Sequence, residues 1–250
     1  MYRKIIFKHA FFIALFAVFI ALTLNILCIH GDSGQQAEQT RVPILLYHSV
    51  RDTPVGIPEL SVSTEAFDEQ MQYLSDHGYT SIDLTQLKTC SPEEKPVVIT
   101  FDDGYCDNYS NAYPILKKYH MRATIFLITK LINQDGYLSA DEIKSMEDLV
   151  SFQSHTVDHE RLDLLSLRQV KYECAASQKA LCTLTGKPVY ALSYPNGHFN
   201  AQDSKMASSY YNYAVTTLQG FNTRHTNPYH LKRSAVSRFD TLSDFIALLG

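Results

Sequence analysis

Short apolar runs that resemble β-strands alternate with helix-like segments from residue 44 to the end of this 250-residue chain. Strands that alternate with helices usually form a parallel sheet or barrel. The sequence therefore predicts an α/β fold, and its length suits one catalytic domain plus a leader. The strand-like runs are Ile44–Tyr47, Thr80–Leu84, Val97–Phe101, Ala123–Ile128, Leu149–Gln153, Val189–Leu192, Tyr213–Thr217 and Leu231–Val236.

Start and stop signals mark the helices between these runs. Ser139 and Ser166 each open a capping box, with Glu142 and Gln169 three residues later. The second of these helices is predicted to run to about Thr185 and to stop at Gly186. Further helices are expected before Gly78, with a face of Phe67, Met71 and Leu74, and at Tyr113–Tyr119, Ala201–Tyr211 and Leu242–Leu249.

The run Val97–Phe101 ends in two adjacent carboxylates, Asp102 and Asp103, which Gly104 follows. Neighbouring side chains of a regular strand point to opposite faces. Both can reach one cleft only at a strand end, where a glycine lets the backbone turn. One could then bind a metal ion while the other acts as a base, and the spacing does not decide which. When the sequence Asp-Asp-Gly occurs without other motifs, it is more often a simple turn.

About fifty residues later, the run Leu149–Gln153 is followed by His155 and His159. On a helical turn this spacing would place both rings on one face. Neutral imidazole is a common ligand for zinc and related ions. Such a pair is usually a solvated helix face, but together with a carboxylate from another strand end it indicates a metal site with open positions. The bound metal would activate water and polarise a carbonyl group.

These segments resemble the motifs of the polysaccharide deacetylase family, the nodulation-type deacetylases grouped as carbohydrate esterase family four. Thr100–Gly104 matches the first motif, and His155–His159 matches the second motif, His-Ser/Thr-x-x-His. Leu192–Gly197 resembles the third, but Ser193 stands where the family has arginine and Asn196 where it has an aromatic residue. The resemblance extends from about residue 42 to the C-terminus and implies a distorted (β/α)7-like barrel.

The order of the motifs is similar to that of one branch of the family, which deacetylates poly-N-acetylglucosamine. The late Leu-x-His motif has no convincing match, whereas Pro43–His48 opens the domain. In this branch the motifs are circularly permuted, so the resemblance implies His48 as the general acid. A core or capping histidine is the alternative for His48. Because Ser193 replaces arginine, Arg233 is a candidate to orient Asp102, although a surface arginine is the simpler interpretation without the family.

The resemblance implies hydrolysis of an N-acetyl group from a sugar amine, a linear amide. Asp103, His155 and His159 would hold a divalent metal, zinc by default, with cobalt, nickel or iron as alternatives. Asp102 would take a proton from the attacking water. His48 would protonate the departing amine, because nitrogen leaves poorly unless it is protonated.

The third motif is expected to meet the substrate. A backbone N–H near Tyr194, with Pro195 and Asn196, would stabilise the oxyanion. The expected substrate is a polymer of N-acetylated amino sugar resembling poly-N-acetylglucosamine. Peptidoglycan, chitin oligomers or a lipid-linked amino sugar are alternatives, as is a catalytically inactive glycan-binding domain. The net charge of −4 and the lack of a basic block argue against a nucleic-acid partner.

The first 30 residues have a different composition. Arg3, Lys4 and Lys8 precede an apolar run at residues 10–29, which is long enough to span a bilayer. Basic residues before the run and acidic residues after it fit an exported domain. We expect a signal-anchor or signal peptide at 1–30, a linker at 31–41 and the deacetylase domain at 42–250. The protein would be extracytoplasmic, either membrane-anchored through residues 10–29 or secreted.

Four cysteines lie in the expected domain, and export permits disulfides. Cys174 and Cys182 would be about 12 Å apart along one helix, which is too far for a bridge. Cys90 and Cys106 flank the same strand, so a bridge between them is possible but is not predicted.

Overall fold

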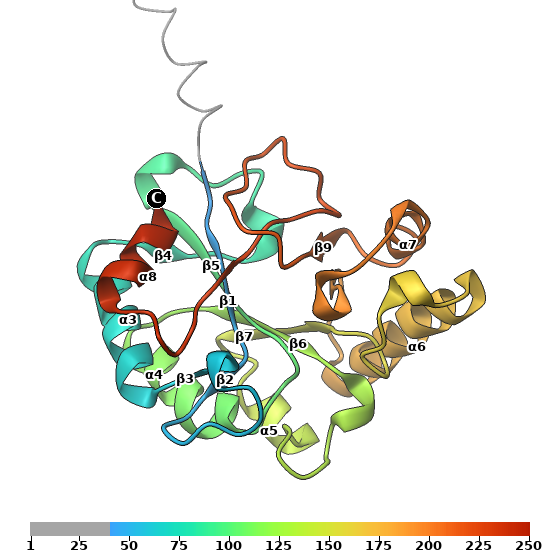
Figure 1. Ribbon diagram of the computed structural model, residues 1–250, viewed down its shortest axis with the longest axis horizontal. Coiled ribbons are helices and arrows are strands. Elements are labelled where there is room, and N and C mark those ends of the chain that lie inside the picture. The colour runs from blue at the N-terminus through green and yellow to red at the C-terminus, as the bar shows by residue number, and fades with distance from the viewer. Residues whose placement is uncertain (1–40) are drawn as a thin grey trace, which may run out of the picture. The chain divides into compact units, whose positions relative to one another are not determined.

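A curled parallel β-sheet forms the centre of the computed structural model, which describes residues 41–250 (Figure 1). Every pair of neighbouring strands is parallel, in the order β10-β1-β5-β6-β7-β8-β9, and β4 pairs with β5. These strands are β1 (Ile44–Tyr47), β4 (Thr80–Ser81), β5 (Pro96–Phe101), β6 (Ala123–Leu127), β7 (Val150–Ser154), β8 (Ala191–Ser193), β9 (Tyr213–Val215) and β10 (Ser234–Ala235). A separate two-stranded sheet pairs β2 (Ser49–Val50) with β3 (Ser61–Val62).

The segment before β10 connects the two ends of the sheet. Leu231 forms a parallel bridge with Val215 of β9. A few residues later, Ser234 and Ala235 pair with β1. The sheet therefore curls back towards its first strand, and the predicted distorted (β/α)7-like barrel is confirmed. Leu231–Val236 is expected to be one strand, but β10 is shorter because the segment changes partner from β9 to β1.

Helices surround the sheet and contribute the outer layer of the fold (Figure 1). The two predicted capping boxes are present, because Ser139 and Ser166 accept from the backbone N–H groups of Glu142 and Gln169. The α-helices are α3 (Thr64–Asp76), α4 (Tyr113–Lys118), α5 (Ala140–Ser145), α6 (Leu167–Thr185), α7 (Ala201–Ala207) and α8 (Leu242–Leu249). Short 3-10 helices lie at Pro58–Leu60, Leu84–Gln86, Pro92–Glu94, Thr129–Leu131, Leu162–Leu164 and Pro195–Gly197, and a π-helical turn at Asn108–Ala112.

Several predicted elements differ from the structure in their ends or surroundings. The strand expected at Thr80–Leu84 stops at Ser81, because Asp83 caps a 3-10 turn through the N–H of Thr85. The helix α7 stops at Ala207 rather than at residue 211. The helix α4 is preceded by the π-helical turn, a feature that has no simple sequence periodicity.

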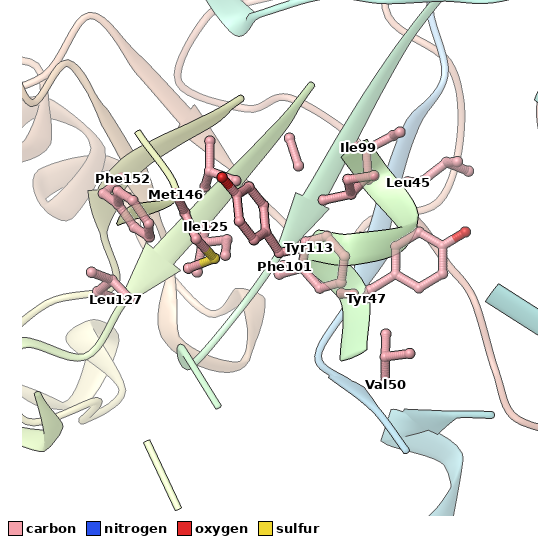
Figure 2. Packing of buried hydrophobic residues seen from close by; sticks show 14 of the residues in the cluster. Leu45, Tyr47, Val50, Ile99, Phe101, Tyr113, Ile125, Leu127, Met146 and Phe152 are labelled. Carbon is pink, nitrogen blue, oxygen red and sulfur yellow. The ribbon is translucent and has the colours of Figure 1, made fainter. Parts of the chain in front are cut away.

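Side chains of the central strands alternate between two apolar clusters. Leu45, Tyr47 and Phe101 belong to the larger cluster (Figure 2). This cluster packs outward against the helices, and the ring centroids of Tyr47 and of Phe67 in α3 are 5.2 Å apart. The smaller cluster contains Ile44, Val98, Phe126 and Leu231 on the opposite side of the strands. Because side chains alternate along a strand, Asp102 continues the inner row of Val98 and Thr100. The register of β5 thus delivers Asp102 to the interior of the barrel.

The described residues contain no helix long and apolar enough to cross a bilayer. The signal-anchor or signal peptide predicted at residues 1–30 lies outside the described residues, and so does the linker except for Arg41. The four cysteines between residues 41 and 250 are free thiols, so Cys90 and Cys106 form no bridge. Cys174 and Cys182 both lie on α6, as expected.

Candidate active site

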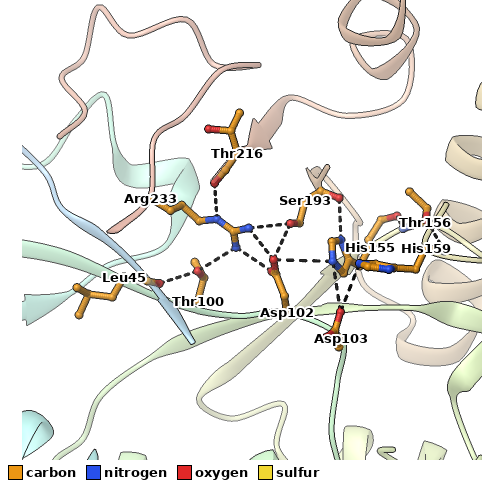
Figure 3. Close-up of polar contacts among 11 residues, drawn as sticks. Leu45, Thr100, Asp102, Asp103, His155, Thr156, His159, Ser193, Thr216 and Arg233 are labelled. Carbon is orange, nitrogen blue, oxygen red and sulfur yellow. Dashed lines mark hydrogen bonds and ion pairs between the residues drawn. The ribbon is translucent and has the colours of Figure 1, made fainter. Parts of the chain in front are cut away.

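Asp102 follows the last residue of β5 and is almost completely buried, at 3% exposure. Arg233 donates from Nη1 to Oδ1 at 2.8 Å and from Nη2 to Oδ2 at 2.6 Å. The hydroxyl of Ser193 donates to Oδ2 at 3.0 Å (Figure 3). A bidentate arginine with a third donor fixes both the position and the plane of a carboxylate. Asp102 is therefore held rigidly, with its charge compensated.

Arg233 is fully buried, so the alternative of a surface arginine is wrong. Its Nε donates to the carbonyl oxygen of Thr216 at 2.9 Å, its Nη1 to Thr100 Oγ1 at 3.3 Å and its Nη2 to Ser193 Oγ at 2.9 Å. The guanidinium thus reaches Asp102 from the segment before β10 instead of from the third motif. A serine at position 193 fits this arrangement, because its short side chain bonds both partners.

The pKa of Asp102 reflects this setting. Burial alone would raise it, but the charges of Arg233 and His155 and the hydrogen bonds from Arg233 hold the pKa well below the usual range. The carboxylate is therefore ionised at neutral pH and available to accept a proton.

Asp103, His155 and His159 bring three potential ligand atoms within 4.8 Å of one another. The Oδ1 atom of Asp103 lies 3.5 Å from His155 Nε2 and 3.6 Å from His159 Nε2 (Figure 3). This oxygen is buried and has no hydrogen-bond partner among the described residues. Two ligand atoms at about 2.0–2.1 Å from a tetrahedral zinc ion are about 3.4 Å apart. The spacing and the donor types therefore fit a divalent metal.

The orientation of His155 supports the same fit. Its Nδ1 lies 2.8 Å from the carbonyl oxygen of Ser193. A carbonyl can only accept, so Nδ1 donates this hydrogen bond, and Nε2 faces Asp103. Such a bond on the far nitrogen is typical of metal-binding histidines.

The segment from His155 to His159 is not helical, so a helical turn is not what brings the two rings together. Thr156 and His159 instead have left-handed backbones, with φ of 67° and 60°. The two rings still lie 4.6 Å apart between centroids. A β-branched residue rarely adopts this conformation, and such strain is often found at functional sites.

His48 lies between β1 and β2, and the side chain of Asn108 in the π-helical turn bonds its carbonyl oxygen at 2.8 Å. Burial lowers the pKa of His48, and the charges of Asp102 and Asp103 offset part of this effect. The imidazole is therefore within electrostatic reach of both carboxylates, as a shared site requires.

The predicted part of Tyr194 in the site needs a correction. Its N–H donates to the carbonyl of Val215 at 3.1 Å within the sheet, and its side chain is fully buried against Phe199. Pro195 has no N–H and is buried. Asn196 is exposed with a left-handed backbone at φ 55°, and the described residues provide no acceptor for its N–H. Asn196 is thus the member of the motif with a backbone donor available.

Several residues near the site were not predicted. The rings of Tyr105 and Tyr137 stack with centroids 5.3 Å apart. Burial, and then the nearby charge of Asp103, raises the pKa of both hydroxyls. Asp107 is buried and accepts from Val50 N–H at 3.0 Å, next to His48. No periodicity marks these positions. Glu173 was also missed, although a charged residue on the buried face of α6, beside Val170 and Cys174, is a usable signal.

Gly197, at the end of the third motif, is expected not to tolerate a side chain. A Cβ there would lie 2.0 Å from Thr217 Oγ1, and the residue has φ +71°. Gly197→Ala should lower the free energy of unfolding by about 1–3 kcal/mol through overpacking, measured by urea denaturation. The matched control is Gly78→Ala, which has φ +72° and no atom within 4 Å of its Cβ. Equal losses in both variants would contradict the steric argument.

Known proteins are similar to this chain in sequence and in fold. A model of the polysaccharide deacetylase family matches residues 89–215. The Bacillus subtilis protein YxkH, which is named as a polysaccharide deacetylase, is 40% identical over 206 residues. These residues cover 79% of this chain and 72% of that protein. The poly-β-1,6-N-acetyl-D-glucosamine N-deacetylase of Staphylococcus epidermidis is 31% identical over 208 residues, with coverage of 74% and 72%.

A solved structure agrees with these similarities. The polysaccharide deacetylase BC0361 of Bacillus cereus is similar with a TM-score of 0.79 and 32% identity, covering 84% of this chain and 69% of that one. The sequence motifs, the barrel and these similarities lead to one conclusion: the chain belongs to the polysaccharide deacetylase family and is an enzyme of that family.

Proposed function

We propose that this deacetylase removes N-acetyl groups from a poly-N-acetylglucosamine-like polymer by metal-dependent hydrolysis outside the cytoplasm. The observation that supports it best is that two adjacent residues, Asp102 and Asp103, have different partners. Asp103 Oδ1 lies opposite two imidazole Nε2 atoms, and Asp102 beside it is held by Arg233. This arrangement combines a ligand set with a separate base.

Asp103, His155 and His159 would hold the divalent ion, with zinc as the default and cobalt, nickel or iron as alternatives. When bound, such an ion would activate water as a nucleophile and polarise the acetyl carbonyl. Two imidazoles and one carboxylate leave coordination positions open, as a catalytic site requires.

The protein's own groups would then move the protons. Asp102 would accept a proton from the attacking water, because Arg233 keeps it ionised and fixed in position. His48 would donate a proton to the departing amine. Burial lowers the pKa of His48, which makes the imidazolium a stronger acid but leaves less of it present at neutral pH. The backbone N–H of Asn196 would bind the developing oxyanion in place of the group expected at Tyr194.

The substrate assignment draws on the relatives. Staphylococcal proteins 28–31% identical to this chain are named poly-β-1,6-N-acetyl-D-glucosamine N-deacetylases. The stacked Tyr105 and Tyr137 beside Asp103 offer aromatic surface that suits a sugar ring. Export would follow from the basic and then apolar residues 1–30, with the linker at 31–41 and the domain at 42–250.

Amine release from β-1,6-linked N-acetylglucosamine oligomers tests the proposal. The full chain, stripped of metal and then supplied with zinc, cobalt or nickel, is expected to release amine only in the supplied samples. Asp102→Asn should reduce the rate about 10²–10⁴-fold, because it removes the base. Amine release only from peptidoglycan fragments or chitin oligomers would refute the proposed substrate and favour that glycan instead. Amine release without any metal would refute the metal-dependent mechanism.

A further inference from the structure

Glu173 on α6 lies beneath the turn that supplies two of the three proposed metal ligands. Its carboxylate is buried, at 5% exposure. One oxygen, Oε2, accepts from the backbone N–H of Val157 at 2.8 Å and from that of Asp158 at 3.1 Å. These are two of the three residues between His155 and His159. A charged acceptor therefore contacts the middle of the turn from a rigid helix.

The neighbouring N–H groups of the turn are also bound by side chains. Thr156 N–H donates to Ser154 Oγ at 3.1 Å, and His159 N–H donates to Thr156 Oγ1 at 3.1 Å. Successive N–H groups around left-handed residues form a concave site that favours an anion. Glu173 supplies that anion from within the protein, and it supplies the only carboxylate bonded to these four N–H groups in the described chain.

The conformation of the turn has a cost that these bonds offset. Left-handed backbone is unfavourable at a residue other than glycine, and both Thr156 and His159 adopt it. Without an acceptor at Glu173, the N–H groups of Val157 and Asp158 would be partly buried without these partners. The turn would then relax, and the two imidazoles would no longer face the same oxygen of Asp103.

We propose that Glu173 is a positioning residue of the metal site, whose carboxylate holds the His155–His159 turn in its ligand-binding conformation. The proposal rests on the proposed metal-dependent function. It assigns Glu173 no contact with metal or substrate. It also explains why a charged residue occupies the buried face of α6, where Val170 and Leu181 are apolar.

The test compares metal affinity in matched variants of the full chain. Glu173→Met keeps the approximate volume but removes the acceptor, and it should weaken Zn²⁺ or Co²⁺ binding about 10- to 100-fold. Glu173→Gln keeps an accepting oxygen and should recover most of the affinity. Val170→Ala, one turn away on the same helix, controls for loss of stability and should bind metal like the wild type. Titration calorimetry and the visible absorption of the Co²⁺ form provide readouts independent of catalysis.

The outcomes separate the two proposals. Wild-type affinity in Glu173→Met, or an equal loss in Val170→Ala, would overturn the role of Glu173 while leaving the metal site intact. A wild-type protein that binds neither ion would refute the metal site itself, and this inference with it. Hydrogen exchange gives a measurement that needs no variant. The Val157 and Asp158 amides should be protected in the metal-free protein, and exchange at open-loop rates would overturn the proposal.

Discussion

Arg233→Met is expected to inactivate the enzyme and to lower its free energy of unfolding by about 3–5 kcal/mol, the usual cost of removing one partner from a buried ion pair. Arg233 is fully buried, and both of its terminal nitrogens bond Asp102. Without the guanidinium, Asp102 would be a buried charge with only Ser193 and the neighbouring histidines as partners. Urea denaturation and amine release measure the two effects.

The stability of the wild type and of Arg233→Met should change with pH in opposite directions. In the wild type the pKa of folded Asp102 is held below its unfolded value of about 3.9. Its contribution is therefore present above about pH 4 and is lost as the pH falls towards the folded pKa. In Arg233→Met, burial should raise the folded pKa above the unfolded one. The contribution of Asp102 should then be present below about pH 4 and be lost as the pH rises.

A matched pair of variants controls the experiment. Arg238→Met removes an arginine that donates to the backbone carbonyls of Arg51 and Ser61 and not to a carboxylate, so it should cost much less stability. The double variant Asp102→Asn, Arg233→Met should be more stable than Arg233→Met alone, because no buried charge remains. Full activity in Arg233→Met would refute the assignment of Arg233 as the residue that orients the base.

Asp103→Asn is expected to weaken divalent-metal binding by at least about 100-fold, beyond the range typical for groups that only support ligands. Asp103 Oδ1 is the buried, unpartnered oxygen between the two imidazoles among the described residues. An amide oxygen carries no charge, so it binds a cation far less well. Amine release should fall with the affinity, and excess metal should restore part of it.

The adjacent residue provides the control for that result. Asp102→Asn changes the same functional group one position earlier, but its Oδ2 is 3.8 Å from His155 Nε2 and is already bonded to Arg233 and Ser193. Metal affinity should stay within a few-fold of the wild type while activity is lost. Loss of metal from Asp102→Asn alone would reverse the roles of the two carboxylates.

Local signals in the sequence predicted most of the barrel. Strand β1 has the predicted bounds, Ile44–Tyr47, and α6 ends before Gly186, whose left-handed backbone at φ 68° is a common helix stop. These features depend on apolar periodicity and on hydrogen bonds between residues three or four apart. The shortened β10 was not predictable in this way, because its end depends on pairing with strands far away in the sequence.

The sequence by itself determined which chemical groups follow the strands. Side chains alternate along β5, and the strand ends before Gly104, so Asp102 and Asp103 lie at a strand end. Only the tertiary structure decided how those groups are held. Arg233 donates hydrogen bonds to Asp102, 131 positions earlier in the sequence. Glu173, on the next helix, accepts hydrogen bonds from the turn after His155. The charge of Glu173 on the buried face of α6 is a local signal, but the partner in each contact has none. Each contact is a hydrogen bond between segments that only the closed barrel and its packed helices bring together.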